Sequence, residues 1–582
     1  MQKDDVMVRI GGQAGDGSYA AGELLAKVLK HSGLWVVTLR DFPSRIRGGH
    51  TNYTVRAKDR PIYGRGDYID FLVAFDQDSI LLHSGEMRPG GAIIYDSSLG
   101  ITVGPELHRD DVSYFPIPLG QLAKEKLGAL IVRNSIALGA LVELLGMSDD
   151  PFLWIIDETF AKKGLAGKNR DAYLLGREEA RRARGSFSGY SIEPDCDEGR
   201  IFLLGDEAIA YGALVAGCRL EVAYPITPAT EIIEWLAPRL PQYGGAVLQA
   251  EDEIAAICMA IGASYAGVRA MTTTSGPGFA LMTEALAMVG ENETPVVIVD
   301  AQRAGPSTGL PTKTEQGDLN QAIFSAHGDF PRIVISPGNV EESFYLIAEA
   351  FNLADRFQCP VILLTEQTVA QTKQTIARFD LSRITIDRGK LLSQEELAKL
   401  DGYRRYALTE DGISPRARPG LAGGNFIANS NEHNEASFID ESVPNRILMM
   451  NKRMRKLEVA KAYVPPPQLH GDEEGEIGFI GYGGVYGPVL EAMDALAQKG
   501  LRSKFLQLVT LWPFPEGEVQ AFLEGVRKAF VVEQNYTGQL RGLIQRFVGP
   551  SPKIESVLRY DGQPFRPLDI VEAVEAKTGV IA

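Results

Sequence analysis

Four short runs of small residues and polar anchors constrain the fold of this chain most. They lie close together, in loops or at the starts of helical patterns, within a segment where strand and helix patterns alternate. Such a segment folds as a parallel sheet covered by helices, and these sheets bind ligands at the carboxyl ends of their strands. The sequence therefore predicts one mouth of a parallel α/β sheet, lined by residues 224–230, 249–256, 272–278 and 303–313.

The same alternation predicts an α/β protein with three α/β domains and mostly parallel sheets. In the first domain, residues 1–190, the apolar patterns predict strands at 6–10, 34–38, 71–74 and 92–95, a glycine-rich turn at 11–17 and a helix at 20–31. The second, residues 200–380, has apolar runs at 296–300 and 360–364, typical of strands covered on both faces. The third, residues 466–582, should contain strands at 477–481 and 530–533 and a helix at 489–498.

Two segments lack this alternation of strand and helix patterns. Residues 178–199 read as the end of a helix and then an exposed linker. Residues 381–465 contain prolines and paired glycines without a clear period, and so long an irregular stretch is either disordered or functional. Their aromatic residues and arginines favour an ordered arm that packs on a partner.

Charge and hydropathy exclude several classes of protein. The net charge is −16 with no long basic run, which argues against nucleic acid or an anionic membrane as the main partner. No apolar stretch reaches the roughly 20 residues that span a bilayer, and the first residues lack the apolar core of a signal peptide. We expect a cytoplasmic protein.

The four cysteines limit the redox chemistry of the chain. Cys196, Cys218, Cys258 and Cys359 are far apart and form no CxxC pair, whereas a [4Fe–4S] cluster usually needs four closely spaced cysteinates. Cys258 and Cys359 stand in apolar patterns and are expected to be core thiols. Any iron–sulfur cluster must therefore lie on another chain.

The four runs together resemble the alpha subunit of the 2-oxoacid:ferredoxin oxidoreductases. Residues 224–228 match that family's YPITP signature, and residues 249–256 resemble the acidic run that holds its thiamine-contacting glutamate. The resemblance extends over nearly the whole chain. Its layout is that of the fused gamma–alpha form, often associated with 2-oxoglutarate. It implies a pyrimidine-binding central domain, a transketolase-like C-terminal domain and thiamine diphosphate as cofactor.

The resemblance points to one of three neighbouring acids, Glu251, Asp252 and Glu253, as the carboxylate that activates the cofactor. We favour Glu253, because it opens a small-residue helical run as the family glutamate does. Such a carboxylate bonds the aminopyrimidine ring and needs a dry site, where its hydrogen bond is strong. Acidic residues at a helix start also complement the helix dipole, and this simpler explanation is expected to hold for one or two of the three.

Thr227 and Arg303 have local explanations as well as catalytic ones. Thr227 before Pro228 is the pattern of a helix N-cap with proline in the first turn. Arg303 comes after a strand, where it could fork onto a carboxylate or form a surface salt bridge. The resemblance places Thr227 near the thiazolium and the substrate, and assigns the substrate's carboxylate end to Arg303 and Thr312.

Further contacts come from the resemblance. Lys313 could reach a distal carboxylate, although a solvated lysine is an equal alternative. The resemblance assigns Tyr224, Pro225, Ser275 and Gly276 to the cofactor, the last two in a strand-to-helix turn that faces it in pyrimidine-binding domains.

The N-terminal domain carries two loops with features of phosphate-binding sites. Gly15, Asp16 and Gly17 fit a relaxed dinucleotide fingerprint with Asp41 downstream, which would indicate NAD. The second loop contains Arg45, Arg47, Gly48 and Gly49, and its arginines suit a phosphorylated ligand. The resemblance implies coenzyme A here, and we favour it. A plain surface turn is the alternative for each loop.

The chain lacks a properly placed magnesium motif. The resembled enzymes hold the diphosphate through Mg²⁺ with a Gly-Asp-Gly run and a later asparagine, but the one such triplet here, at 15–17, lies outside the thiamine-like region. We therefore predict no metal site in this chain. Diphosphate binding, Mg²⁺ and a [4Fe–4S] cluster are assigned to a beta subunit.

The leading hypothesis is thus a subunit of a CoA-acylating 2-oxoacid:ferredoxin oxidoreductase, active only with its beta subunit in an (αβ)₂ assembly and reducing ferredoxin. Two alternatives remain open at this point. One is a subunit of a non-oxidative thiamine enzyme such as a decarboxylase or transketolase. The other is an NAD-binding regulatory module built on the loop at Gly15–Gly17.

Overall fold

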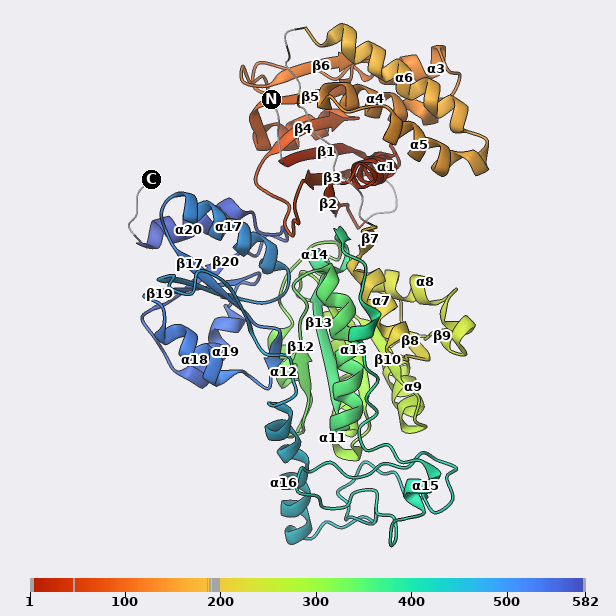
Figure 1. Ribbon diagram of the computed structural model, residues 1–582, viewed down its shortest axis with the longest axis vertical. Helices are drawn as coiled ribbons and strands as arrows, with labels where there is room; N and C mark the ends of the chain where they lie inside the picture. The colour runs from red at the N-terminus through yellow and green to blue at the C-terminus, as the bar shows by residue number, and fades with distance from the viewer. Residues whose placement is uncertain (1–4, 45–47, 186, 188–189, 191–198, 579–582) are drawn as a thin grey trace. The chain divides into compact units, whose positions relative to one another are not determined.

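The computed structural model describes residues 5–44, 48–185, 187, 190 and 199–578. The chain forms two compact units (Figure 1). The first contains the chain up to Leu203 together with Thr372–Arg378, and the second contains Leu204–Gln371 and the chain from Phe379 onward. The segment Thr372–Arg378 therefore leaves the central part of the sequence and joins the N-terminal unit. The four-part division by residue number stays a prediction.

The first unit is an eight-stranded sheet with helices on its faces. Its strand order is β6-β5-β4-β1-β3-β2-β14-β7, and β1, β4, β5 and β6 run parallel to one another, whereas β3 is antiparallel to both of its neighbours and β14 is antiparallel to β2. The strands are β1 (Asp5–Gln13), β2 (Trp35–Asp41), β3 (His50–Lys58), β4 (Ile69–Ala74), β5 (Met87–Asp96), β6 (Ser113–Ile117), β7 (Ile201–Leu204) and β14 (Lys373–Ile376).

The helices of this unit are held by apolar faces and by close approach at glycines. Helix α1 buries Leu24, Leu25, Val28 and Leu29, the spacing that predicted it. A Cβ on Gly139 of α4 would overlap the backbone of α6, so these two helices pack closely. The helices are α1 (Ser18–His31), α2 (Gln77–His83), α3 (Leu119–Glu125), α4 (Arg133–Leu145), α5 (Asp150–Phe160) and α6 (Ala166–Ala183).

Two expectations for this unit need correction. Strand β1 continues to Gln13, so the turn expected at 11–17 begins only after it. Tyr190, expected in an exposed linker, is 6% exposed and its hydroxyl donates to Asp70 Oδ1 at 3.2 Å. Helix α6 ends at Ala183 as expected, and of the expected linker, residues 186, 188, 189 and 191–198 lie outside the described part of the chain.

The second unit is built on two sheets that share one core. The larger has the order β18-β12-β13-β11-β10-β8-β9, in which only the edge strand β18 is antiparallel. Its strands are β8 (Leu220–Ala223), β9 (Ala246–Gln249), β10 (Ala270–Thr274), β11 (Val296–Gln302), β12 (Ile333–Ile335), β13 (Pro360–Glu366) and β18 (Thr510–Trp512). The helices between them are α7 (Gly205–Val215), α8 (Thr230–Leu236), α9 (Glu253–Tyr265), α10 (Gly276–Leu281), α11 (Thr283–Asn292), α12 (Leu319–Phe324), α13 (Val340–Phe357) and α14 (Gln367–Ala370).

The smaller sheet has the order β15-β17-β16-β19-β20 and is parallel except for β15. Helices α17 and α20 cover one face and α18 and α19 the other (Figure 1). The elements are β15 (Gln468–Gly471), β16 (Ile477–Gly481), α17 (Tyr486–Gln498), β17 (Ser503–Gln507), α18 (Glu516–Glu524), β19 (Lys528–Glu533), α19 (Gln539–Val548), β20 (Ile554–Leu558) and α20 (Pro567–Thr578). The strand and helix predictions for this region are confirmed.

The arm, residues 381–465, is ordered and packs on its own chain. It contains the short helix α15 (Gln394–Leu397) and the 18-residue helix α16 (Val443–Ala460), which the irregular sequence pattern did not predict. Arg405 Nη2 donates to the backbone carbonyl of Glu293 at 2.7 Å, and Lys452 Nζ pairs with the carboxylate of the same residue at 2.5 Å. The arm is thus tied to the end of α11.

Candidate active site

The four runs converge as the sequence predicts. Strands β11, β10, β8 and β9 are consecutive neighbours in one parallel sheet, and each of the four runs begins in the last residues of one of them or directly after it. The side chains after Gln302, Thr274, Ala223 and Gln249 therefore share one edge, the carboxyl edge where such sheets bind ligands.

The three neighbouring acids have different environments. Asp252 is the N-cap of α9, and its side chain accepts a hydrogen bond from Ala255 N at 2.7 Å. Glu251 is exposed, whereas Glu253, the first residue of the helix, is 6% exposed. The dipole and capping explanation therefore accounts for Asp252, and burial separates Glu253 from both neighbours.

Glu253 lies against the turn that starts α10. A Cβ on Gly278 would lie 2.5 Å from Glu253 Oε1 and would also overlap Thr274 Oγ1, so only glycine leaves room for the carboxylate. Within the described residues, Glu253 makes no hydrogen bond or salt bridge. A buried carboxylate without a partner is costly, and a donor supplied by a ligand would satisfy it.

Arg303 joins two of the runs. It comes after β11, is 7% exposed, and its Nη1 donates to the backbone carbonyl of Thr227 at 2.8 Å. Burial lowers the pKa of Arg303, and the negative charges of Asp318 and Glu253 oppose this shift. Its Nε is buried without a partner among the described residues. Among the described residues Arg303 therefore forms no surface salt bridge, and the charge of Glu253 acts on its guanidinium.

The expectation that Thr227 caps a helix is wrong. Helix α8 begins at Thr230, its N-cap position is Ala229, and no side chain caps it. The carbonyl of Thr227 instead accepts from Arg303. The residue belongs to a loop held by a long-range contact, which the local pattern could not reveal.

The remaining predicted residues are spread along the same edge. Tyr224 is 41% exposed and Pro225 half-buried, just after β8. Ser275 is fully buried at the start of α10, with its Oγ unpartnered within the described residues. Thr312 is buried and Lys313 half-buried, and the carbonyl of Lys313 accepts from Ala304 N at 2.9 Å.

A cleft of about 590 Å³ opens beside Arg303 and Gly276. One wall comes from residues 303–318, and the other comes from Asn535, Tyr536 and Thr537, which come after β19 of the smaller sheet. Thr312 and Lys313 are not among the described residues that line it. Sequence reasoning missed the second wall, although these residues also stand at the end of a parallel strand, as those of the first wall do.

Two interacting carboxylic acids, half-buried Asp318 and fully buried Asp300, belong to this region. Asp318 lines the cleft and donates its backbone N–H to Gln302 Oε1 at 3.0 Å. Burial raises the pKa of Asp318 to about 7, with Glu315 adding to the shift, and burial beside Asp318 holds the pKa of Asp300 well above its usual range. Asp318 therefore titrates close to neutral pH at the lining of the cleft. These two acids were not predicted, because nothing in the local sequence shows how far each becomes buried.

The two glycine-containing loops of the first unit have some features of a phosphate site, but one of their predicted residues is used by the fold itself. Gly15, Gly17, Gly48 and Gly49 all have positive φ, and Ala14 N donates to Gly49 O at 3.2 Å, so the two loops are adjacent. Asp16 is used by the fold, because it accepts from Gln13 N at 2.9 Å and pairs with Arg133 at 3.2 Å. Arg45 and Arg47 lie outside the described residues.

One group in the described part of the chain has the geometry of a metal site, formed by Glu291, Glu432 and His433. Arg453 already bridges the two carboxylates, with Nη1 3.0 Å from an oxygen of each. An arginine in this place supplies the positive charge that a metal ion would bring.

Of the four cysteines, Cys218 and Cys359 are buried and Cys258 is exposed, while Cys196 lies outside the described residues. The prediction of a core thiol is confirmed for Cys359 and wrong for Cys258, which lies on the outer face of α9.

Among the described helices, none combines the length and hydropathy needed to cross a membrane.

Comparison with known proteins gives the class first. A family described as "Pyruvate flavodoxin/ferredoxin oxidoreductase, thiamine diP-bdg" matches residues 211–452, which include all four runs. "Pyruvate ferredoxin/flavodoxin oxidoreductase" matches residues 7–179, and "Pyruvate:ferredoxin oxidoreductase core domain II" matches residues 475–570. The fold and the site therefore define a subunit of a thiamine-dependent oxidoreductase, with the gamma-type and alpha-type parts in one chain.

Individual relatives narrow the class. The chain is 34% identical to 2-oxoacid:ferredoxin oxidoreductase 2, subunit alpha, of Aeropyrum pernix, over 98% of this chain and 97% of that protein. It is 37% identical to the 2-oxoglutarate synthase subunit KorA of Methanothermobacter thermautotrophicus, over 64% of this chain and 97% of that one. The 2-oxoglutarate:ferredoxin oxidoreductase of Magnetococcus marinus, solved with 2-oxoglutarate, coenzyme A and succinyl-CoA bound, superposes with a TM-score of 0.94 at 37% identity, covering 99% of this chain and 100% of that one. The chain belongs to the 2-oxoacid:ferredoxin oxidoreductase family, as an alpha subunit. The non-oxidative and NAD-binding alternatives are set aside.

Proposed function

We propose that this chain acts on 2-oxoglutarate as the alpha subunit of a CoA-acylating ferredoxin oxidoreductase. The reaction converts 2-oxoglutarate, coenzyme A and two oxidised ferredoxins to succinyl-CoA, CO₂, a proton and two reduced ferredoxins, or runs in reverse. The observation that carries the proposal is that Glu253 and Arg303 stand at one sheet edge, 6% and 7% exposed respectively, with the Glu253 carboxylate charge acting on the Arg303 guanidinium. The ligands of the Magnetococcus marinus enzyme support this choice of substrate.

Glu253 is the residue that would hold the cofactor in its active form. Its carboxylate would accept a hydrogen bond from the aminopyrimidine ring of thiamine diphosphate, and burial strengthens that bond. When bound, thiamine diphosphate supplies the electron sink needed to break the bond between the 2-oxo carbon and the carboxylate. Tyr224, Pro225, Ser275 and Gly276 stand in the two runs that would line the same cofactor.

Arg303 and Thr227 would bind the 2-oxo acid end of the substrate. The guanidinium can donate two parallel bonds to a carboxylate while its Nη1 stays fixed to the Thr227 carbonyl. Thr312, on the same loop, would bind this end together with Arg303, and Lys313 would reach the distal carboxylate that distinguishes 2-oxoglutarate from shorter 2-oxo acids.

A beta subunit would complete the enzyme in an (αβ)₂ assembly. The three described cysteines lie in separate elements or loops, so we assign the [4Fe–4S] cluster, the Mg²⁺ ion and the docking of ferredoxin to that subunit. The assembly would work in the cytoplasm.

Coenzyme A would meet the paired glycine loops of the first unit. Backbone N–H groups at positive-φ glycines can hold phosphate oxygens, here at Gly15, Gly48 and Gly49. Arg45 and Arg47 would add charge-assisted bonds, and Asp16 would hold the loop through Arg133.

Purification from the native cell, with the co-purifying chain sequenced, tests the assembly. The complex should reduce ferredoxin with 2-oxoglutarate and coenzyme A, and faster than with pyruvate. The isolated chain should be inactive and contain neither iron nor acid-labile sulfide. A stoichiometric cluster on this polypeptide would reject the partner assignment, and a preference for pyruvate would reject the substrate.

Steady-state kinetics with variants test the coenzyme A assignment. Arg45→Ala and Arg47→Ala should raise the KM for coenzyme A and leave the KM for 2-oxoglutarate unchanged, and the exposed Arg60→Ala is the matched control. Calorimetry on the assembled complex should detect coenzyme A and not NAD. No effect of either arginine on coenzyme A would overturn the assignment.

A further inference from the structure

The arm brings more buried positive charge onto the second unit than its buried carboxylates balance. Apart from Arg453, which is paired with Glu291 and Glu432, five cationic side chains around the contact between the arm and the rest of this unit are each at most 4% exposed. Within the described residues, their salt bridges go to two buried carboxylates, Glu293 and Asp355. The five are Arg269, Arg405, Arg416, Lys452 and Lys456.

Buried lysines can lose their charge, whereas buried arginines keep theirs. Burial lowers the pKa of Lys452 to about 7 and also lowers that of Lys456, so a lysine can lose its proton and with it the charge. An arginine keeps its charge in a protein. The charges that need a counterion are therefore those of the three arginines.

Of the three arginines, Arg405 is the one with no salt bridge of its own among the described residues, because the nearby charge of Glu293 also serves Lys452 and Lys456. Its Nη2 donates to the backbone carbonyl of Glu293 at 2.7 Å, and within the described residues it forms no salt bridge with any carboxylate. Its Nη1 is buried with no hydrogen-bond partner there. Arg416 lies nearby and has Asp355 at 3.1 Å, but it shares that carboxylate with Arg269 and Arg388.

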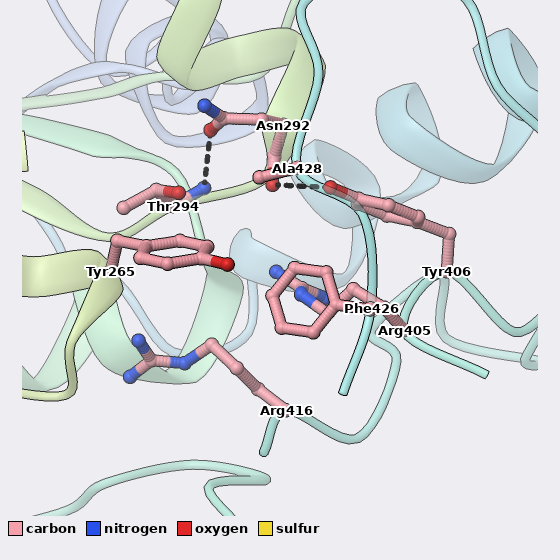
Figure 2. A pocket seen from close by; sticks show the side chains of 8 residues that line it. All are labelled: Tyr265, Asn292, Thr294, Arg405, Tyr406, Arg416, Phe426 and Ala428. Atoms are coloured by element: carbon pink, nitrogen blue, oxygen red, sulfur yellow. Dashed lines mark hydrogen bonds between the residues drawn. The ribbon is translucent and has the colours of Figure 1, made fainter. Parts of the chain in front are cut away.

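A small cavity lies between these side chains (Figure 2). Figure 2 shows the Arg405 guanidinium and the Tyr265 hydroxyl pointing into the same space, with the Phe426 ring beside them and Arg416 below. The Tyr406 hydroxyl is turned away toward Asn292 O, at 3.4 Å. The volume of about 10 Å³ suits one small occupant, a water molecule or a monoatomic ion.

We propose that this cavity binds one monoatomic anion, chloride in solution, held by Arg405 Nη1 and the charge of Arg416. A water molecule would satisfy the free N–H group but would leave the arginines without a counterion. A phosphate or a carboxylate is too large for the space. The anion links the arm, which carries both arginines, to Tyr265 of α9 and Thr294 beside α11. It therefore fastens the arm to the unit that carries the proposed active site.

Bromide is the probe that locates the anion. Crystals of the assembled protein grown in sodium bromide should show an anomalous peak within hydrogen-bonding distance of Arg405 Nη1. A water molecule in the cavity, or no density there, would reject the proposal. This experiment uses the unaltered protein, so it does not depend on the folding of any variant.

Thermal unfolding tests whether the anion matters in solution. Replacing gluconate by chloride at constant ionic strength should raise the Tm by about 2 °C, because a ligand of the folded state alone stabilises it. Arg405→Met should abolish this chloride dependence, while Arg404→Met, at an exposed neighbouring arginine, should retain it. A bromide peak in the crystal without a chloride-dependent Tm would indicate an adventitious ion only and would also reject the proposal.

Discussion

Glu253 is the residue on which the proposed chemistry depends most. We expect Glu253→Gln to lower kcat by about 10²–10⁴-fold, because an amide cannot take the proton-sharing role of the carboxylate. The size and burial of the side chain are preserved, so the proposed (αβ)₂ assembly should form normally in gel filtration. Glu251→Gln, at the exposed neighbour, is the matched control and should keep normal turnover. Normal turnover of the Glu253 variant would show that another group activates the cofactor.

Arg303 is expected to act through both the paired N–H donors and the positive charge of its guanidinium. Arg303→Lys should lower kcat/KM for 2-oxoglutarate by about 10–100-fold, since lysine cannot donate two parallel bonds and would lose the contact to the Thr227 carbonyl. The KM for coenzyme A should not change. Arg239→Lys, at an exposed position, controls for the substitution itself. A loss confined to coenzyme A affinity would move Arg303 to the other ligand.

For single residues, the sequence could identify candidate site residues but not the burial and the contacts that distinguish them. The choice among Glu251, Asp252 and Glu253 came from a family resemblance, and the structure separates them because α9 turns the first residue inward and uses Asp252 as its cap. Thr227 was expected to cap a helix because a cap motif is local. Its actual partner, Arg303, is 76 residues away in sequence.

Helix α10 leaves room for the Glu253 carboxylate because residue 278 is a glycine. Gly278→Ala would place a methyl group 2.5 Å from Glu253 Oε1, so we expect the carboxylate to be displaced and kcat to fall about 10-fold or more. Gly262→Ala in α9 is the matched control, because a Cβ there meets nothing within 4 Å. The control should keep full activity and gain about 0.5–1 kcal/mol in helix stability. Equal activity of the two variants would mean that Gly278 has no role in placing Glu253.

Strands and helices with clean periodicity were predictable, and elements that depend on distant partners were not. Strand β3 was missed because Asn52, Thr54 and Arg56 are polar yet buried, which hides the alternation that marks a strand. Strand β14 was assigned to the central domain, but it pairs with β2 across more than 300 residues of sequence. Helix α16 was missed because it buries lysines and an arginine against acids of α11 and the loop after it, rather than an apolar stripe.

At the scale of the whole molecule, buried acids predict how stability changes with pH. Glu221 on β8 is fully buried, its Oε1 accepts from Thr273 Oγ1 at 2.8 Å, and burial raises its pKa to about 8. The unfolded chain ionises this group near its ordinary pKa of 4.5. Unfolding therefore releases a proton between these values, and the stabilisation present below pH 4.5 is lost as pH rises to about 8.

Glu221→Gln should remove this contribution. The variant keeps an acceptor for Thr273, and we expect its Tm to exceed that of the wild type above pH 8 by an amount equivalent to about 1–3 kcal/mol. Near pH 4.5 the two proteins should be similar. Calorimetric scans across this range measure the effect, with the exposed Glu234→Gln as control. A Tm difference independent of pH would show that Glu221 does not titrate in this range.

The local pattern of residues was sufficient for the α/β class, for the parallel central sheet and for the mouth at which the four runs meet. Strand periodicity and strand-end chemistry are short-range properties, so they can be read without coordinates. Burial, by contrast, is a long-range property that depends on which elements pack together. The burial of Glu253 and Asp300, the contact of Arg303 with Thr227, and the cationic cavity beside the arm all required the folded chain. In each case the environment of one side chain is set by residues distant in the sequence.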